Sequence, residues 1–144
     1  IRSDGALFTW GNNNIYQLGD GTTVAKSSPV QLGTSSWSIV ACGDQHTAAI
    51  RSDGIVYTWG YNASGQLGNN STVSTSSPVL IAVTLGSATE YWSKVSVNGL
   101  RTTAIGGDGR LWTWGNNSNG MLGLGISTSS IIQPTSVPLS NIFI

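Results

Sequence analysis

A short motif that occurs three times in the 144-residue chain limits its fold more than any other feature. The triplet Thr-Trp-Gly recurs at intervals of 49 and 55 residues, preceded each time by Asp-Gly and followed by Leu-Gly. Self-similarity at a period of about 50 residues is typical of repeat architectures, in which each unit buries its apolar face only by stacking on its neighbours. The repeated positions are Trp10, Gly11 and Gly19, then Trp59, Gly60 and Gly68, then Trp114, Gly115 and Gly123.

The local pattern within each unit predicts strands. Ala6–Trp10 and Ile55–Trp59 are short runs of aromatic and β-branched residues that follow an Asp-Gly pair. Because Asp-Gly favours a tight turn, Thr47–Ile50 and Ile55–Trp59 are expected to pair antiparallel. Further strands are expected near Val30–Leu32 and Trp37–Cys42, and no helical apolar stripe is present. Each unit thus supplies about four short strands, the content of one propeller blade.

The blade-like units span approximately residues 4–52, 53–107 and 108–144, and the last is truncated. The longer second interval arises from six extra residues between Pro78 and Trp92. An insertion confined to one place predicts a longer surface loop there.

The order and spacing of these motifs carry a family resemblance. The segments Tyr57-Thr58-Trp59-Gly60, Gly65-Gln66-Leu67-Gly68 and Ser77-Pro78-Val79, and His46-Thr47 after Gly43, resemble the repeat of the regulator of chromosome condensation family. The resemblance covers almost the whole chain and implies an all-β fold, a β-propeller that usually has seven blades. Seven blades need roughly 350 residues, so this chain holds about three partial or whole blades. We expect a fragment of a longer chain, with ring closure by oligomerisation as the alternative.

Composition excludes several functions. The chain has 6 Lys plus Arg and 6 Asp plus Glu, with a formal net charge of zero. Nucleic-acid binding driven by charge is therefore not expected, because few phosphates could be neutralised. A single cysteine, Cys42, offers neither a disulfide nor a cysteine-rich zinc site, and no apolar run is long enough to insert into a membrane. We expect no metal and no cofactor.

Candidate catalytic residues are few. His46 is the only histidine and is interpreted as a framework residue whose ring bonds the backbone in a turn. Three of the six acidic residues belong to Asp-Gly turns on separate blades, so a pair of facing carboxylates is not expected. We therefore expect no catalytic residue and a chain that is not an enzyme. The repeated tryptophans are expected to pack between blades, and the repeated glycines to form turns.

The leading hypothesis is a non-enzymatic interaction or structural module. Contacts with protein partners, with further copies of the chain or with surface glycans are expected in the variable segments 12–16, 81–91 and 127–133. The candidate contact residues are Asn12, Asn13, Tyr16, Thr84, Glu90, Tyr91 and Ser129.

Three further expectations go with this hypothesis. The low charge and the abundance of Asn, Ser, Thr and Gly favour a bacteriophage virion part or an extracellular bacterial surface protein, with a cytoplasmic location as the alternative. The family resemblance implies a second reading, a guanine-nucleotide exchange regulator of a small GTPase. A third reading is a polysaccharide-active propeller enzyme whose catalytic residues lie outside this chain.

Overall fold

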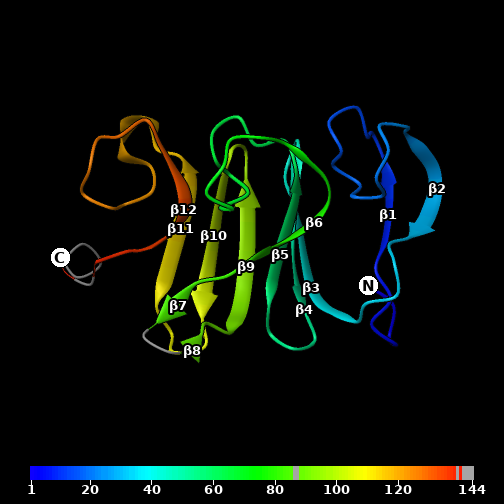
Figure 1. Cartoon of the computed structure of the whole chain (residues 1–144), viewed down its shortest axis with the longest axis horizontal. Coiled ribbons are helices and arrows are strands. Elements are labelled where there is room, and N and C mark those ends of the chain that lie inside the picture. The colour runs from blue at the N-terminus through cyan, green and yellow to red at the C-terminus, as the bar shows by residue number, and fades with distance from the viewer. Residues whose placement is uncertain (86–87, 139, 141–144) are drawn as a thin grey trace.

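The protein is an all-β partial propeller made of antiparallel sheets that stand side by side (Figure 1). The computed structural model describes residues 1–85, 88–138 and 140. The first sheet contains β1 (Phe8–Gly11) and β2 (Lys26–Gln31). The second contains β3 (Trp37–Cys42), β4 (His46–Arg51), β5 (Val56–Gly60) and β6 (Thr75–Ile81), and the third contains β9 (Trp92–Asn98), β10 (Arg101–Gly106), β11 (Leu111–Asn116) and β12 (Ser130–Ser136).

The two four-stranded sheets combine strands from successive sequence units. In the second sheet, β3 and β4 come from unit 4–52, whereas β5 and β6 come from unit 53–107. The third sheet takes β9 and β10 from unit 53–107 and its other two strands from the next unit. One blade is therefore built from two successive units rather than from the four strands of one unit. This offset connects neighbouring units, because the strands of both are hydrogen-bonded into one sheet.

The expected antiparallel hairpin is present. Thr47 pairs with Trp59 and Ala49 with Tyr57, across a turn in which Gly54 has φ +83°. This left-handed backbone explains the glycine after Asp53, because a residue with a β-carbon is strained there. The six-residue insertion contains a short hairpin of β7 (Thr84–Leu85) and β8 (Ala88–Thr89), and a 3-10 turn, η1 (Ser118–Gly120), follows β11.

The core lies between neighbouring sheets. One cluster joins Leu7 and Leu32, which directly flank β1 and β2, to Trp37 and Trp59 of the second sheet. The indoles of Trp37 and Trp59 meet edge to face at 6.0 Å. The next cluster repeats this pattern, with Trp92 and Trp114 at 6.1 Å. Stacked blades thus bury the apolar surface that one unit alone would expose. The other buried members of the cluster that contains Trp92 and Trp114 are Ile50, Val56, Ile81, Ala104 and Trp112.

Candidate functional site

The repeated Trp and Leu-Gly motifs meet where one blade packs on the next. A β-carbon added at Gly19 would lie 2.6 Å from Nε1 of Trp59, and one added at Gly68 would lie 2.6 Å from Nε1 of Trp114. Both tryptophans are fully buried. Only a glycine therefore lets the loop of one blade lie flat on the indole of the following blade.

Trp10 is the counterpart of Trp59 and Trp114 in the first repeat, but its environment differs from theirs. Its side chain is 59% exposed, and a β-carbon added at the neighbouring Gly11 would meet nothing within 4 Å. Trp10 borders a groove of about 390 Å³ lined with apolar side chains, among them Leu7, Phe8 and Val40. In the other two blades an inner strand, β4 or β10, pairs with the strand that carries the equivalent tryptophan.

A buried asparagine organises each of the three long loops that connect the two outer strands of a blade. We call these segments, residues 12–25, 61–74 and 117–129, the loop face, because they lie along one edge of the molecule in Figure 1. In the second loop, Oδ1 of Asn62 accepts a 2.9 Å bond from the Leu67 amide, and Nδ2 donates to the Ser71 and Val73 carbonyls at 2.9 and 3.0 Å. Asn13 and Asn117 make the corresponding bonds in the other loops.

These contacts place Asn13 in the interior of its loop. Its side chain is completely buried, and its amide bonds the Thr22 and Val24 carbonyls. Asn13 was expected among the contact residues, but its polar atoms are used within the loop. The periodic equivalence of Asn13, Asn62 and Asn117 is the sequence signal that would have identified this role.

His46 connects two blades rather than bonding the backbone of its own turn. Its Nε2 lies 2.9 Å from Oγ1 of Thr102, and that hydroxyl lies 2.8 Å from the Gln66 carbonyl. A carbonyl oxygen can only accept, so the Thr102 hydroxyl donates to the Gln66 carbonyl. The same hydroxyl therefore accepts from Nε2 of His46, which must carry the ring proton. Burial lowers the pKa of His46 to about 4. His46 is therefore a neutral structural donor at neutral pH.

No metal-binding cluster is present among the described residues. No group of three or more His, Cys, Asp or Glu side chains could hold a metal ion within residues 1–85, 88–138 and 140. The buried carboxylate of Glu90 accepts a 2.8 Å bond from the Gly107 amide. This bond attaches the inserted segment to the third sheet. Burial raises the pKa of the Cys42 thiol, which disfavours the reactive thiolate. In the part of the chain that the structure describes, no helix is long and apolar enough to cross a membrane.

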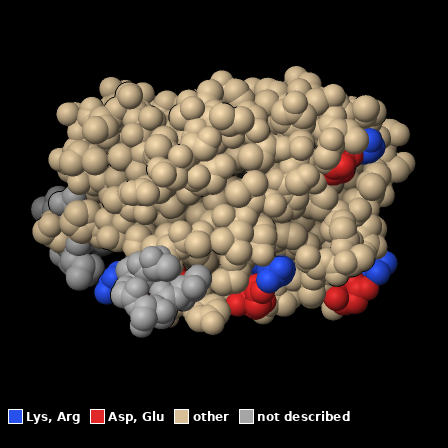
Figure 2. All heavy atoms as spheres, in the orientation of Figure 1, with Lys and Arg blue, Asp and Glu red and all other residues tan. Residues whose placement is uncertain are grey.

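The two edges of the propeller differ in charge. On the edge of the Asp-Gly turns, each blade carries one Arg–Asp ion pair, and Figure 2 shows that the charged side chains visible in this view gather there, apart from one pair near the first blade. The loop face contains a single charged residue, Asp20, which pairs with Lys26 at 3.2 Å. A partner of the loop face would therefore meet a nearly neutral surface.

Each loop also exposes one β-branched aliphatic side chain. Val24 is 61% exposed, Val73 is 70% exposed and Ile126 is 46% exposed. Val24 and Val73 occupy equivalent positions, since each carbonyl accepts from the buried asparagine eleven residues earlier, while Ile126 stands nine residues after Asn117. These three residues were not among the predicted contact residues. The recurrence of valine at positions 24 and 73, which stand 49 residues apart like the flanking motifs, was the available signal.

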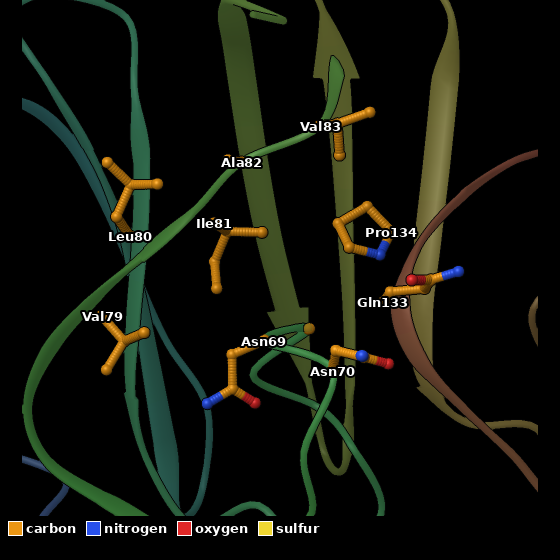
Figure 3. A pocket seen from close by; sticks show the side chains of 10 residues that line it. Asn69, Asn70, Val79, Leu80, Ile81, Ala82, Val83, Gln133 and Pro134 are labelled. Carbon is orange, nitrogen blue, oxygen red and sulfur yellow. The ribbon is translucent and has the colours of Figure 1, made fainter. Parts of the chain in front are cut away.

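A groove opens at the outer rim between the second and third sheets (Figure 3). It has a volume of about 520 Å³ and is lined by the amides of Asn69, Asn70 and Gln133 and by the β6 residues Val79–Ile81. The preceding joint has a similar groove of about 610 Å³. None of the described residues that line the groove of Figure 3 is ionisable, and the groove offers polar contacts through its amide side chains.

The outer strands that border these grooves carry proline at equivalent places. Pro29, Pro78 and Pro134 lie in β2, β6 and β12, each the outermost strand of its sheet. Proline lacks the amide proton that a further strand would need, so it hinders edge-to-edge pairing. The prolines therefore disfavour the pairing of a further strand with β2, β6 or β12.

The remaining candidate contact residues are spread over both edges. Asn12 and Ser129 are exposed on the loop face, and Tyr16 is half-buried there with φ +65°. Tyr91 is 62% exposed, but it belongs to the inserted segment and lies close to the Gly54 turn on the opposite edge. Thr84 lies in β7, and its side chain is outside the described part of the structure.

Comparison with known proteins agrees with this architecture. The repeat described as "Regulator of chromosome condensation (RCC1) repeat" matches residues 4–50, 53–98 and 108–142. A 49-residue stretch, 32% of this chain, is 47% identical to the human E3 ubiquitin-protein ligase HERC2, of which it covers 1%.

Solved structures share the fold. The human WBSCR16 structure has 28% identity and a TM-score of 0.84, over 96% of this chain and 36% of WBSCR16. Prp20p from Saccharomyces cerevisiae, in a structure reported with its binding properties to Gsp1p and histones, has 21% identity and a TM-score of 0.78, over 96% and 35% of the two chains. The chain thus spans about a third of the length of these structures.

Proposed function

Because this chain belongs to the regulator of chromosome condensation (RCC1) repeat family, we propose that it is part of a non-enzymatic propeller that binds a protein partner through its loop face. The observation that carries this proposal is one exposed aliphatic side chain in each loop of a nearly neutral face. Isolated exposed apolar residues are ordinary on protein surfaces, but their recurrence in every blade favours a contact surface.

The loops are also rigid enough to present these side chains in fixed positions. The carbonyl oxygens of Val24, Val73 and Ile126 accept hydrogen bonds of 3.3, 3.0 and 3.0 Å from the buried asparagines. A preorganised surface binds with less loss of conformational entropy than a mobile one. Aliphatic rather than aromatic side chains favour a protein partner over a glycan, which binds best to aromatic faces.

Site-specific photocrosslinking in the organism of origin tests this proposal. A photoreactive residue at position 73 is expected to give a covalent protein adduct, whereas the same residue at Leu80, which is 48% exposed on β6, should not. Val24→Lys should reduce the adduct, and higher salt should leave its yield unchanged, because the face holds one ion-paired charge. Equal adducts from positions 73 and 80, or none from 73, would contradict the proposal.

The location in a virion or on a bacterial surface belongs to the same proposal and rests on composition. A surface with few charges keeps its contacts when the salt concentration changes, as an extracellular assembly requires. Immunodetection of the protein in purified virions or on intact cells tests this location. Its detection only in the cytoplasmic fraction would favour the alternative.

Nucleotide exchange on a small GTPase is the second candidate function. It comes from the family relationship, and the Prp20p structure, which was reported with binding to Gsp1p, shares the fold. Release of a fluorescent guanine nucleotide from a purified small GTPase of the same organism tests it. Accelerated release would support exchange and would replace simple partner binding as the function.

A further inference from the structure

The chain contains two Asn-Gly dipeptides, Asn98-Gly99 and Asn119-Gly120, and in each a glycine without a side chain follows the asparagine. In such a pair the glycine amide nitrogen attacks the carbonyl carbon of the asparagine side chain. The new C–N bond closes a five-membered succinimide, and the side-chain nitrogen leaves as ammonia. Water then opens the ring at either carbonyl and yields aspartate or isoaspartate. The reaction needs no enzyme, oxidant or cofactor.

The fold treats the two pairs differently. The Gly120 amide donates a 2.9 Å hydrogen bond to the Asn117 carbonyl within the 3-10 turn η1. That amide must lose this bond before its nitrogen can approach the Asn119 side chain. Asn117 is itself buried and tied to Leu122 and Ile126, so the acceptor is held in place.

Asn98-Gly99 has no such protection. Asn98 is exposed at the end of β9, and Gly99, with φ +54°, begins the turn into β10. Among the described residues no hydrogen-bond acceptor is present for the Gly99 amide, and a β-carbon at Gly99 would meet nothing within 4 Å. No hydrogen bond of the Gly99 amide therefore has to break before its nitrogen approaches the Asn98 side chain.

We propose that Asn98 is a site of spontaneous modification, at which the folded protein converts an asparagine to aspartate or isoaspartate while Asn119 is spared. Asn98 and Arg101 are directly paired across the β9–β10 hairpin. Conversion therefore places a carboxylate opposite the Arg101 guanidinium, where opposite charges attract. The turn also adjoins the loop face, because the Leu100 carbonyl accepts a 2.9 Å bond from the Asn116 amide. The modification adds a negative charge to an edge that carries few charges.

The test uses the two dipeptides as an internal pair. Purified full-length protein is kept in a mildly alkaline buffer, sampled over time, and digested briefly with trypsin at slightly acidic pH. Cleavage after Lys94 and Arg101 releases residues 95–101, and cleavage after Arg110 places Asn119 in a separate peptide. Mass spectrometry follows the replacement of the side-chain NH₂ by OH in each peptide.

The folded protein is expected to convert Asn98 about fivefold faster than Asn119, since an amide hydrogen bond contributes roughly 1 kcal/mol. In concentrated urea both positions should convert at similar rates, which would show that the fold causes the difference. Asn98→Gln should abolish the change in residues 95–101, because glutamine would have to close a less favourable six-membered ring. A native rate at Asn119 equal to or above that at Asn98, or no conversion of Asn98 in the folded state, would overturn the proposal.

Discussion

The indole nitrogen of Trp59 donates a 3.0 Å hydrogen bond to the backbone carbonyl of Gln17, 42 residues earlier in the chain. The same carbonyl accepts a 2.9 Å bond from the Thr47 hydroxyl. Gln17 lies in a loop of the first blade, whereas Thr47 and Trp59 belong to the second sheet, so one carbonyl joins two blades. At the following joint the Gln66 carbonyl takes this position and accepts from Thr102. The blades are therefore held together by a repeated polar contact beside a repeated indole.

This joint predicts that Gly19→Ala is much more destabilising than Gly21→Ala. Both glycines have positive φ, +75° and +79°, so the backbone strain of an alanine is similar at the two positions. A β-carbon at Gly19 would clash with Trp59, whereas one at Gly21 meets nothing within 4 Å. We expect Gly21→Ala to cost about 1 kcal/mol and Gly19→Ala to cost an additional 1–3 kcal/mol, roughly, from overpacking.

Urea unfolding followed by tryptophan fluorescence measures this difference. Because Gly21→Ala carries the same backbone strain, it isolates the contact with the indole. Equal losses of stability in the two variants would show that the indole can shift without cost, and would remove the physical reason for the repeated Leu-Gly.

The hydrogen bonds of the buried loop asparagines predict that Asn62→Ala lowers stability more than Asn12→Ala does. Asn62→Ala removes bonds to the Leu67 amide and to the Ser71 and Val73 carbonyls in a site without solvent access. Leaving such groups unsatisfied costs about 1–3 kcal/mol for each polar group. The exposed Asn12 bonds only the Asn14 amide through its side chain, so Asn12→Ala should change stability by less than about 0.5 kcal/mol.

Thermal unfolding together with limited proteolysis tests this prediction. Asn62→Ala should lower the melting temperature and open the segment 61–74 to cleavage, and Asn12→Ala should do neither. Unchanged proteolysis of that segment in Asn62→Ala would mean that packing, rather than the asparagine, holds the loop.

The repeat was readable from the sequence because each copy performs the same packing task. The tryptophans and the following glycines kept their order, so the repeat followed from spacing, and the propeller followed from the family resemblance that these motifs carry. The half-unit offset of the sheets followed only in part. The Asp-Gly turn predicted that Thr47–Ile50 pairs with Ile55–Trp59 across the boundary between two units, but the period does not state which other strands share hydrogen bonds. The role of Asn13 was missed for a related reason. Polar residues in loops are usually exposed, and only its bonds to Leu18 and Val24 show that it is interior.

The exposure of Val24 and Val73 could not be predicted from the sequence. Val24 and Val73 stand 49 residues apart, as the flanking motifs do, but a valine in a strand-rich chain is expected to be buried. The structure exposes them because the buried asparagine fixes the carbonyl of the same residue and leaves the side chain outside.

His46 predicts a loss of stability between pH 6.5 and about 4. In the folded protein burial lowers the pKa of His46 to about 4, whereas the unfolded chain has a value near 6.5. Below pH 6.5 the unfolded state binds the proton first, so the free energy of unfolding decreases as the pH falls toward 4. Above pH 6.5 the full contribution of neutral His46 to stability is present. The decrease amounts to at most about 3–4 kcal/mol, at roughly 1.4 kcal/mol per pH unit.

Urea unfolding of the wild type and of His46→Gln at several pH values tests this linkage. The variant should be less stable at pH 7, because it alters the contact with Thr102, but its stability should change little from pH 6.5 to 4.5. Asp4 and Asp20 change stability mainly below this window, because their carboxyls in the unfolded chain take up protons near pH 4. In the folded protein, hydrogen bonds from the Arg2 side chain lower the pKa of Asp4 to about 2, and at Asp20 burial is outweighed by bonds from Thr22, which lower its pKa to about 2. The same slope in both proteins would assign the pH dependence to other groups and would contradict a neutral, buried His46.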